Sequence, residues 1–250
     1  MSLRAVAVLP ARYASTRLPG KPLLADTGKP LIQHVWEQVA RAERIERVIV
    51  ATDDTRIHDA VASFGGEAAM TSENHRSGSD RVAEVGRGLP GIDVLINVQG
   101  DEPELDPADL DRLVARLEVG DEDLATLARP FRADEAAAFL DENNVKVVPG
   151  GPSADRLRAL YFSRAPIPFG RDPVGAHLHV GVYAWRRDAL NRFTATAPTP
   201  LEGRERLEQL RAMEQGLSIA VVLTDHDALG IDTPDDYARF VERVRAESES

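Results

Sequence analysis

Apolar runs and amphipathic stretches alternate along the first half of the chain. Short apolar runs predict strands at residues 4–9, 47–52 and 94–98, and helical patterns fill 30–42 and 55–64 between them. Strands that alternate with helices pair in parallel, because each connecting helix crosses one face of the sheet. The pattern therefore predicts an α/β fold with a mostly parallel sheet flanked by helices.

The second half of the chain has a less regular pattern. It predicts, in order, a helix from Pro107 to Glu118, strands at 123–128, 145–148, 160–162 and 179–185, a helix near 201–214, a strand at 218–224 and a closing helix from Pro234. Residues 149–158 and 165–176 are rich in Pro, Gly and Asp, which favours loops or an extension from the main domain.

The composition is that of an ordinary globular protein, with 43% hydrophobic and 28% charged residues among 250. The net charge of −11 argues against nucleic acid or an anionic membrane surface as the main partner. The absence of cysteine excludes disulfides, thiolate metal sites and a cysteine nucleophile. No signal-peptide pattern and no apolar run of about 18 residues occur, so we expect a cytoplasmic protein without membrane insertion.

A basic loop follows the first predicted strand. Residues 10–21, Pro-Ala-Arg-Tyr-Ala-Ser-Thr-Arg-Leu-Pro-Gly-Lys, carry Arg12, Arg17 and Lys21 on a segment broken by Gly and Pro. Ligands of open α/β sheets collect beyond the carboxyl ends of the strands, and three cations with free backbone N–H groups suit a polyphosphate there. The alternative is a solvated basic turn. However, only three lysines occur in this acidic chain, and one of them is here.

Two better-known phosphate motifs do not account for this loop. A Walker A loop would need a Gly and a hydroxyl residue at the positions of Ser15 and Pro22. The segment at 86–91, Gly-Arg-Gly-Leu-Pro-Gly, matches the letters of a dinucleotide fingerprint. It follows a helical pattern and leads into a strand, whereas the fingerprint must follow a strand and open a helix, so we expect a helix C-cap and turn there.

A second candidate site ends the most apolar central strand, at residues 97–103, Asn-Val-Gln-Gly-Asp-Glu-Pro. Gly100 lets the backbone turn so that Asp101 can point toward the same sheet edge as the basic loop. Mg²⁺ is commonly bound by one or two carboxylates plus phosphate oxygens, so Asp101 is a candidate ligand. The alternative is ordinary turn chemistry before the next helix.

A third candidate lies just before the last helix, at residues 230–236, Gly-Ile-Asp-Thr-Pro-Asp-Asp. Thr233 and Asp236 have the spacing of a capping box, and Pro234 occupies the favoured first helical position. A structural role alone would explain this segment. The two roles are compatible, since Thr233 can make the cap while Asp232 ligates a metal.

Other segments carry weaker signals. His179 lies among apolar strand residues, which is typical of a core histidine, and contact with a substrate stays open. Residues 77–81, Ser-Gly-Ser-Asp-Arg, resemble a helix start whose N–H groups could also meet a base or a phosphate. Residues 202–211 form an amphipathic pattern whose charges we expect to be mostly solvated. Neither a zinc-type His pair nor a Gly-x-Ser-x-Gly elbow occurs.

Taken together, these segments resemble the sugar-acid cytidylyltransferases. The resemblance is carried, in the family's order, by residues 10–22, 50–53, 77–81, 97–103, 144–148, 160–165, 179–183, 200–211 and 232–234. It implies a nucleotide-diphospho-sugar transferase fold, which is Rossmann-like, with a smaller dimerisation and substrate-binding extension. It also implies a single nucleotidyltransferase domain, with roughly 1–130 as the CTP-binding half, roughly 131–225 as the sugar-acid-binding and dimerisation part, and 226–250 as a closing metal-site loop and helix.

The resemblance further implies CTP and 3-deoxy-D-manno-octulosonate (Kdo) as substrates, Mg²⁺ as cofactor and a homodimer. The anomeric 2-hydroxyl of Kdo would attack the α-phosphate and release pyrophosphate, in the service of lipopolysaccharide or capsule synthesis. Reactions of this kind depend on positioning and on neutralising charge.

The resemblance also implies the roles of individual residues. Catalytic roles would fall to Arg12, Arg17, Lys21 and Asp101. CTP would be bound by Ala11, Arg12, Arg17, Lys21, Ser77, Gly78 and Arg81. The sugar acid would be held by Gln99, Arg164, His179, Tyr183 and Glu208, with Arg164 a natural partner for a carboxylate. The metal ligands would be Asp101 and Asp232.

Three features depart from the commonest family pattern. Ser79-Asp80 replaces Thr-Glu, Arg76 stands where Gln is frequent, and the stretch 166–176 is shorter than in many relatives. These positions bear on sugar-acid choice and loop closure, so the 8-amino analogue of Kdo, a sialic acid or another 2-keto acid remains an alternative acceptor. A nucleotidyltransferase that uses a sugar 1-phosphate and an inactive nucleotide-binding protein are the alternative functions.

Overall fold

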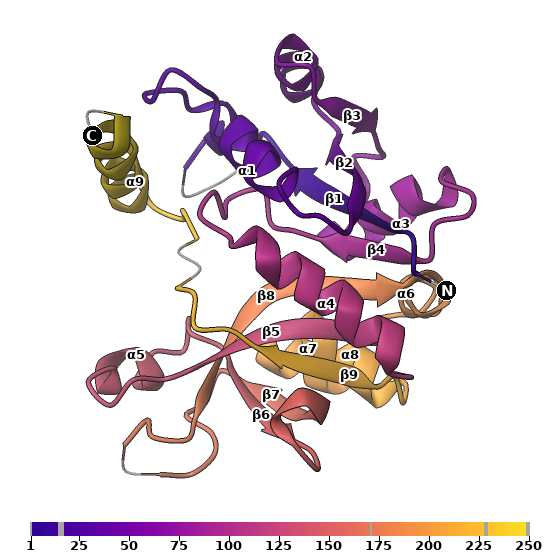
Figure 1. Cartoon of the computed structure of the whole chain (residues 1–250), viewed down its shortest axis with the longest axis vertical. Coiled ribbons are helices and arrows are strands. Elements are labelled where there is room, and N and C mark those ends of the chain that lie inside the picture. The colour runs from indigo at the N-terminus through magenta and orange to yellow at the C-terminus, as the bar shows by residue number, and fades with distance from the viewer. Residues whose placement is uncertain (1, 15–17, 171, 228–229, 249–250) are drawn as a thin grey trace. The chain divides into compact units, whose positions relative to one another are not determined.

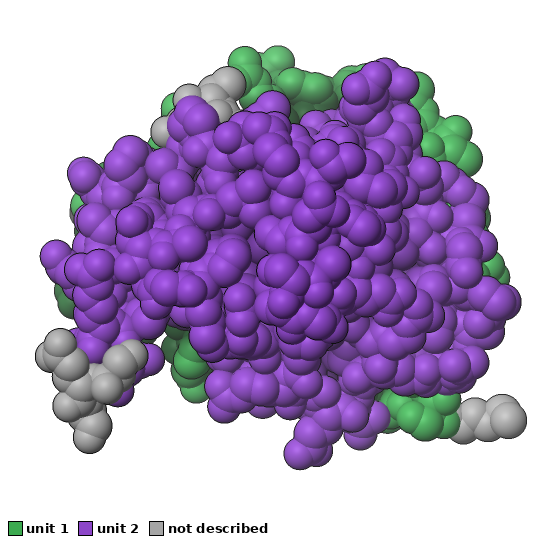
Figure 2. Space-filling model, turned by 90° about the horizontal axis from the view of Figure 1, so that it is seen from above, with its two compact units in different colours: residues 1–3, 112–227 green, residues 4–111, 228–250 purple. Residues whose placement is uncertain are grey.

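The computed structural model describes residues 2–14, 18–170, 172–227 and 230–248 (Figure 1). Arg17, one of the candidate phosphate-binding residues, lies outside these residues. The chain forms two compact units, which Figure 2 colours separately. Unit 1 comprises residues 1–3 and 112–227, and unit 2 comprises residues 4–111 and 228–250.

Parallel strands form the sheet of unit 2. They are β1 (Ala5–Ala11), β2 (Ile45–Thr52), β3 (Glu67–Met70) and β4 (Val94–Asn97). Their order is β3-β2-β1-β4, and each neighbouring pair is parallel. The accompanying helices are α1 (Leu31–Val39), α2 (Thr55–Ser63), α3 (Gly78–Arg87), α9 (Pro234–Ser248), the start of α4 (Pro107–Val119) and the 3₁₀ turn η1 (Lys21–Leu23). The alternation predicted for the first half of the chain is confirmed in this unit.

The core of unit 2 follows from its apolar strands. Residues 5–9 of β1 and 94–96 of β4 are at most 2% exposed. Continuous apolar runs of this kind are typical of strands covered on both faces. Helix α1 adds one apolar stripe, in which Leu31, Val35 and Val39 are buried at the spacing of a helical turn.

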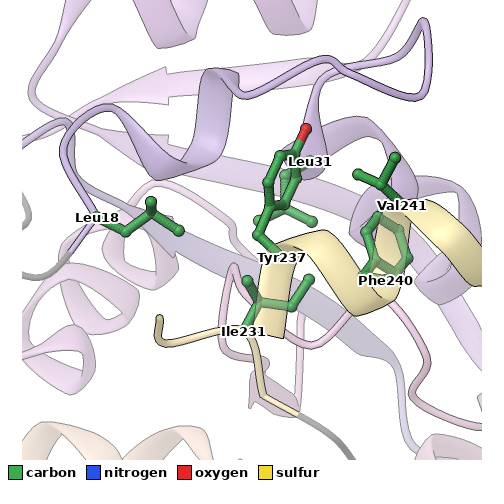
Figure 3. Close-up of a cluster of buried hydrophobic side chains, with 6 residues drawn as sticks. All are labelled: Leu18, Leu31, Ile231, Tyr237, Phe240 and Val241. Atoms are coloured by element: carbon green, nitrogen blue, oxygen red, sulfur yellow. The ribbon is translucent and has the colours of Figure 1, made fainter. Parts of the chain in front are cut away.

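A second apolar cluster fastens α9 to α1 (Figure 3). Its members are Leu18, Leu31, Ile231, Tyr237, Phe240 and Val241. The Tyr237 hydroxyl also accepts a hydrogen bond from the backbone N–H of Asp26, at 2.9 Å. This group of residues, called here the α9 cluster, holds the segment 230–237 in place by burying apolar surface.

The sheet of unit 1 is mixed. Its strands are β5 (Leu124–Pro130), β6 (Lys146–Gly150), β7 (Leu157–Ser163), β8 (His177–Arg186) and β9 (Ile219–Leu223). Their order is β8-β5-β9-β7-β6, and β6 also pairs with β8, so the order closes on itself. The β5–β9 pair is parallel, whereas β5–β8, β7–β9, β6–β7 and β6–β8 are antiparallel.

The α/β class is therefore confirmed, but a mostly parallel sheet does not describe the chain. Strands β6, β7 and β8 follow one another through turns and loops without an α-helical crossover. Such connections permit antiparallel neighbours, whereas parallel neighbours need a long crossover, usually a helix. The apolar pattern of each strand is the same in both cases.

The helices of unit 1 correct one prediction. They are the rest of α4, then α5 (Ala136–Leu140), α6 (Arg187–Thr194), α7 (Pro200–Glu205) and α8 (Glu208–Glu214), with the 3₁₀ turn η2 (Ala154–Arg156). The helix predicted at 201–214 is two helices, because Arg206 adopts a left-handed φ of 55° between them. Arg211 is only 2% exposed and pairs with Glu202 at 3.1 Å, so the expectation of solvated charges is wrong there.

Short elements account for other differences from the sequence pattern. Strand β3 and helices α5 and α6 have four to eight residues and lie where the pattern predicts no element. The helix end predicted near Gly88 is confirmed, since α3 stops at Arg87 and the Gly88 N–H bonds to the carbonyl of Val85 at 3.0 Å. None of the described helices has both the length and the apolar character needed to cross a membrane.

Candidate active site

Unit 2 contains a pocket of about 390 Å³ at the carboxyl ends of β1 and β4. It is lined by Pro10, Ala11, Arg12, Ala14, Lys21, Pro22, Gly78, Gln99, Gly100, Asp101 and Asp232. These residues come from the basic loop, the start of α3, the segment after β4 and the segment before α9. The three sequence segments with the strongest signals, around residues 12–21, 99–101 and 232, therefore meet at one place.

The basic loop is closed at its base. Gly20 has a φ of 68°, a conformation that favours glycine, and its N–H bonds to the carbonyl of Tyr13 at 3.2 Å. The guanidinium of Arg56, on α2, lies 3.3 Å above the Tyr13 ring and covers it. Arg12 lies near the start of this loop and Lys21 at its end, so the two basic side chains that the structure describes flank the loop.

The segment after β4 approaches the end of β1 closely. A Cβ atom on Gly100 would lie 3.0 Å from the carbonyl oxygen of Pro10, closer than side chains normally come. A larger residue at this position would need a small shift of the Pro10 carbonyl. Glycine therefore favours this close approach, and Asp101 follows directly at the pocket wall.

Lys21 joins the two predicted metal ligands. Its Nζ donates to Asp101 Oδ2 at 2.5 Å and to the carbonyl of Ile231 at 2.7 Å, and it lies 3.4 Å from Asp232 Oδ1. The Ile231 N–H in turn bonds to the carbonyl of Asp101 at 2.9 Å. The carboxylates of Asp101 and Asp232 thus both contact the Lys21 ammonium group, so both are within reach of one cation.

The cap of α9 is made by the neighbours of Asp232. Thr233 Oγ1 accepts from the N–H of Asp236 at 3.2 Å, and the Asp236 carboxylate accepts from the Thr233 N–H at 2.8 Å. Hydrogen bonds from Thr233 and from the Asp232 N–H hold the pKa of Asp236 below its usual range, although burial opposes them. Thr233 and Asp236 therefore form the capping box, and Asp232 lines the pocket.

Glu102 is a functional candidate that the sequence reasoning missed. Burial, reinforced by the charges of Asp101 and Asp232, raises the pKa of Glu102 to about 8. Its Oε2 is buried and has no hydrogen-bond partner among the described residues. At neutral pH the Glu102 carboxyl is therefore mostly protonated. Its position directly after Asp101 was the only signal in the sequence.

The start of α3 forms the remaining wall. Ser77 caps the helix by accepting from the Asp80 N–H at 3.2 Å, and Gly78 lines the pocket. Arg81, predicted to bind CTP, is fully buried, and its guanidinium pairs with Asp53 at 2.7 Å and with Thr71. These contacts join α3 to the residues that directly follow β2 and β3.

His75 and Glu84, which the sequence did not single out, form a hydrogen-bond network that supports Arg12. Arg12 Nη2 donates to the carbonyl of His75 at 2.5 Å. The His75 ring pairs with the carboxylate of Glu84 on α3, which also accepts from the N–H of Ser72 at 3.0 Å. The hydrogen bond with His75 and that from Ser72 hold the pKa of Glu84 below its usual range. This network cannot be seen in the sequence, because it depends on how the loop at 72–76 folds back onto α3.

The predicted sugar-acid residues other than Gln99 lie in unit 1. His179 and Tyr183 share strand β8, with ring centroids 5.4 Å apart, and His179 Nε2 lies 3.0 Å from Thr126 Oγ1. Burial lowers the pKa of His179 to about 3, so its imidazole is neutral at physiological pH. Glu208 begins α8.

Arg164 follows strand β7 in the same unit. Its Nε donates to the carbonyl of Glu205 at 2.8 Å and its Nη1 to the carbonyl of Glu142 at 2.9 Å. The Glu205 carboxylate bonds to the backbone N–H of Arg164 and to the Ser163 hydroxyl, at 2.9 and 2.7 Å. Two carbonyl groups therefore orient the Arg164 guanidinium without neutralising it.

Sequence comparison gives consistent results over nearly the whole chain. Residues 6–219 match the family described as Cytidylyltransferase. A 3-deoxy-manno-octulosonate cytidylyltransferase of Trichlorobacter lovleyi is 45% identical, over 97% of this chain and 99% of its own length. The protein of the same name from Myxococcus xanthus is 46% identical, over 98% of each chain.

Solved structures agree with these relatives. A CMP:2-keto-3-deoxy-manno-octonic acid synthetase complexed with CTP is 41% identical and has a TM-score of 0.89, covering 98% of this chain and 99% of its own. A 4-diphosphocytidyl-2C-methyl-D-erythritol synthase from Anaerococcus prevotii has a TM-score of 0.63 at 11% identity. The second likeness shows the fold alone.

Proposed function

The chain belongs to the 3-deoxy-manno-octulosonate cytidylyltransferase family, and we propose that the pocket of unit 2 is where it transfers CMP from CTP to Kdo. The products are CMP-Kdo and pyrophosphate. The observation that carries this assignment is the meeting of Arg12, Lys21, Asp101 and Asp232 at one pocket beyond the ends of two parallel strands. Cations for a triphosphate and carboxylates for a divalent ion are then available together.

CTP binding is assigned to the basic loop and the start of α3. Arg12 and Lys21, with Arg17 of the same loop, would contact the triphosphate and offset the charge that develops on the departing pyrophosphate. Ala11, Ser77 and Gly78 would border the nucleoside, since Ala11 and Gly78 line the pocket and Ser77 begins the same helix. Arg81 would act indirectly, by holding α3 through Asp53 and Thr71.

The donor set of the pocket fits Mg²⁺. This cation prefers oxygen ligands and is usually bound by one or two carboxylates together with substrate phosphates. Asp101 and Asp232 both line the pocket, and both contact the Lys21 ammonium, at 2.5 and 3.4 Å. When bound, a divalent ion neutralises phosphate charge and lowers the pKa of the attacking hydroxyl.

The sugar acid is assigned to Gln99 and to four residues of unit 1. Arg164 would pair with the carboxylate of Kdo, because its guanidinium is oriented by carbonyl groups and keeps its charge. Neutral His179, with Tyr183 and Glu208, would hold the hydroxyl groups of the sugar. We also propose a homodimer in the cytoplasm, as the family resemblance implies.

Pyrophosphate release from each nucleoside triphosphate, with a panel of 2-keto sugar acids as acceptors, tests this function. We expect turnover with CTP and Kdo, and turnover lower by at least about ten-fold with UTP, ATP or GTP, since a lost base contact costs a kcal/mol or more. The 8-amino analogue of Kdo and a sialic acid serve as competing acceptors. Comparable turnover with UTP would remove the cytidylyl assignment, and preference for another acid would change the acceptor only.

A further inference from the structure

Lys21 occupies the position between the two carboxylates that the proposed function assigns to Mg²⁺. Its ammonium contacts Asp101 at 2.5 Å, Asp232 at 3.4 Å and the carbonyl of Ile231 at 2.7 Å. The Lys21 side chain is only 13% exposed, compared with 26% for Asp101 and 48% for Asp232. All three partners are oxygen atoms, the donors that a hard divalent cation also prefers.

An ammonium group and a divalent cation cannot share this position. Metal–oxygen distances for Mg²⁺ are about 2.0–2.1 Å, so the ion would have to sit within the space that Nζ fills. The two positive charges would also repel each other at short range. Lys21 must therefore leave Asp101 before both carboxylates can coordinate a metal.

We propose that Lys21 holds the place of the metal in the nucleotide-free enzyme and gives it up when CTP arrives. This inference rests on the proposed metal site at Asp101 and Asp232. The triphosphate offers Lys21 an alternative set of anionic partners and delivers the divalent ion to the carboxylates. Metal binding at this site is thereby coupled to nucleotide binding, and metal without CTP binds weakly.

Local geometry allows this exchange. Lys21 is the first residue of the turn η1, directly after Gly20, and its side chain has four rotatable bonds with a compact charge at the end. Arg12, which the proposed function assigns to the triphosphate, lines the same pocket as Lys21, so the ammonium needs to move within the pocket only. Its backbone position is kept by hydrogen bonds of Lys21 with Leu18 and Leu24.

The carboxylates stay in place without Lys21. The Ile231 N–H bonds to the Asp101 carbonyl at 2.9 Å, and the Ile231 side chain is 2% exposed within the α9 cluster (Figure 3). Two backbone segments are thus tied together beside the metal position by contacts that do not involve the ammonium. The site keeps its ligands near each other while the cation between them is exchanged.

Mn²⁺ binding without nucleotide tests the proposal, measured by calorimetry or by the spin-resonance signal of free Mn²⁺. Lys21→Met keeps the length of the side chain and removes its charge, so we expect Mn²⁺ affinity in the absence of CTP to rise at least about ten-fold. The melting temperature of metal-free Lys21→Met should fall and recover with Mn²⁺. Lys21→Gln provides a second variant if the first folds poorly.

Lys29→Met is the matched control. Lys29 pairs with Glu37 on the surface at 2.7 Å and is 48% exposed, so this variant removes an equal charge away from the pocket. Its Mn²⁺ affinity and its turnover should equal those of the wild type. If Lys21→Met and Lys21→Gln bind Mn²⁺ no more tightly than Lys29→Met, the proposal is wrong.

Asp101→Asn separates this proposal from the metal site on which it rests. If Asp101→Asn weakens Mn²⁺ binding in the presence of CTP while Lys21→Met fails to strengthen it in the absence of CTP, the metal site stands and the exchange by Lys21 is refuted. If Asp101→Asn leaves Mn²⁺ binding unchanged with and without CTP, the metal site itself is refuted.

Discussion

Asp232 faces the pocket, whereas the residues that follow it cap helix α9. Thr233 and Asp236 satisfy the first turn of α9, and the Asp232 carboxylate faces Lys21 in the pocket. Under the proposed function, stability and chemistry therefore depend on neighbouring side chains, and substitutions can separate them.

Replacing Asp232 with Asn should slow turnover by about 10²-fold or more, roughly 3 kcal/mol of barrier, because an amide binds Mg²⁺ poorly and cannot balance its charge. The melting temperature should change little, since the cap is intact and a half-exposed ion pair contributes little. Steady-state kinetics and thermal unfolding measure the two effects.

Thr233→Ala is the control for this substitution. It removes the cap, so it should cost about 1 kcal/mol of stability while turnover stays close to that of the wild type. Wild-type turnover in Asp232→Asn would leave the segment before α9 with a structural role only.

Helix α3 borders the pocket and also supports the loop that receives Arg12. Its first residues border the pocket, and Glu84, two turns along, fixes the loop whose carbonyl receives Arg12. Arg81, on the same helix, pairs with Asp53. Helix α3 thus acts on Arg12 through the loop at 72–76.

Glu84→Gln should raise the KM for CTP about five-fold, since it weakens a charge-assisted hydrogen bond worth about 1 kcal/mol and loosens the partner of Arg12. The turnover number and the KM for the sugar acid should stay within about two-fold of the wild type. Glu67→Gln, which loses an exposed pair with Arg47, is the matched control. An unchanged KM for CTP would show that the loop at 72–76 needs no support from α3.

The sequence predicts the charged residues next to strands and helices better than the hydrogen-bond networks that support them. Lys21, Asp101 and Asp232 could be identified because each follows or precedes a clear element and carries the charge that its chemistry needs. His75 and Glu84 could not, since nothing in their local pattern differs from that of other surface residues and their roles arise from contacts between segments that the pattern does not connect. The antiparallel pairing of β6, β7 and β8 could not be predicted for a similar reason. The direction of a strand depends on its connections rather than on its apolar pattern.

Burial of His179 makes the stability of the folded molecule depend on pH. His179 is neutral when folded, with a pKa of about 3, while an unfolded histidine has a pKa near 6.5. Above about pH 6.5 both states are neutral and this histidine costs nothing. As the pH falls below that value the unfolded state takes up a proton that the folded state does not, so stability decreases until the pH approaches 3.

His179→Gln should therefore flatten the acid limb of the stability curve. Between pH 7 and pH 5 the wild type should lose on the order of 2 kcal/mol more unfolding free energy than the variant. Urea unfolding at a series of pH values measures this difference. If the two curves were parallel, the His179 imidazole would not be held in its neutral form in the folded state.

The segment that carries Ile231 and Asp232 has a consequence for the synthesis of the chain. Lys21 and Asp232 are 211 residues apart in sequence, yet they meet in one unit, because the chain leaves that unit at residue 111 and returns to it at 228. Ribosomes make the chain from its N-terminus, so the parallel strands and the basic loop exist long before Asp232 does. Under the proposed function, a growing chain therefore has its basic loop long before it has both proposed metal ligands, and we expect CTP turnover to begin only when α9 has docked.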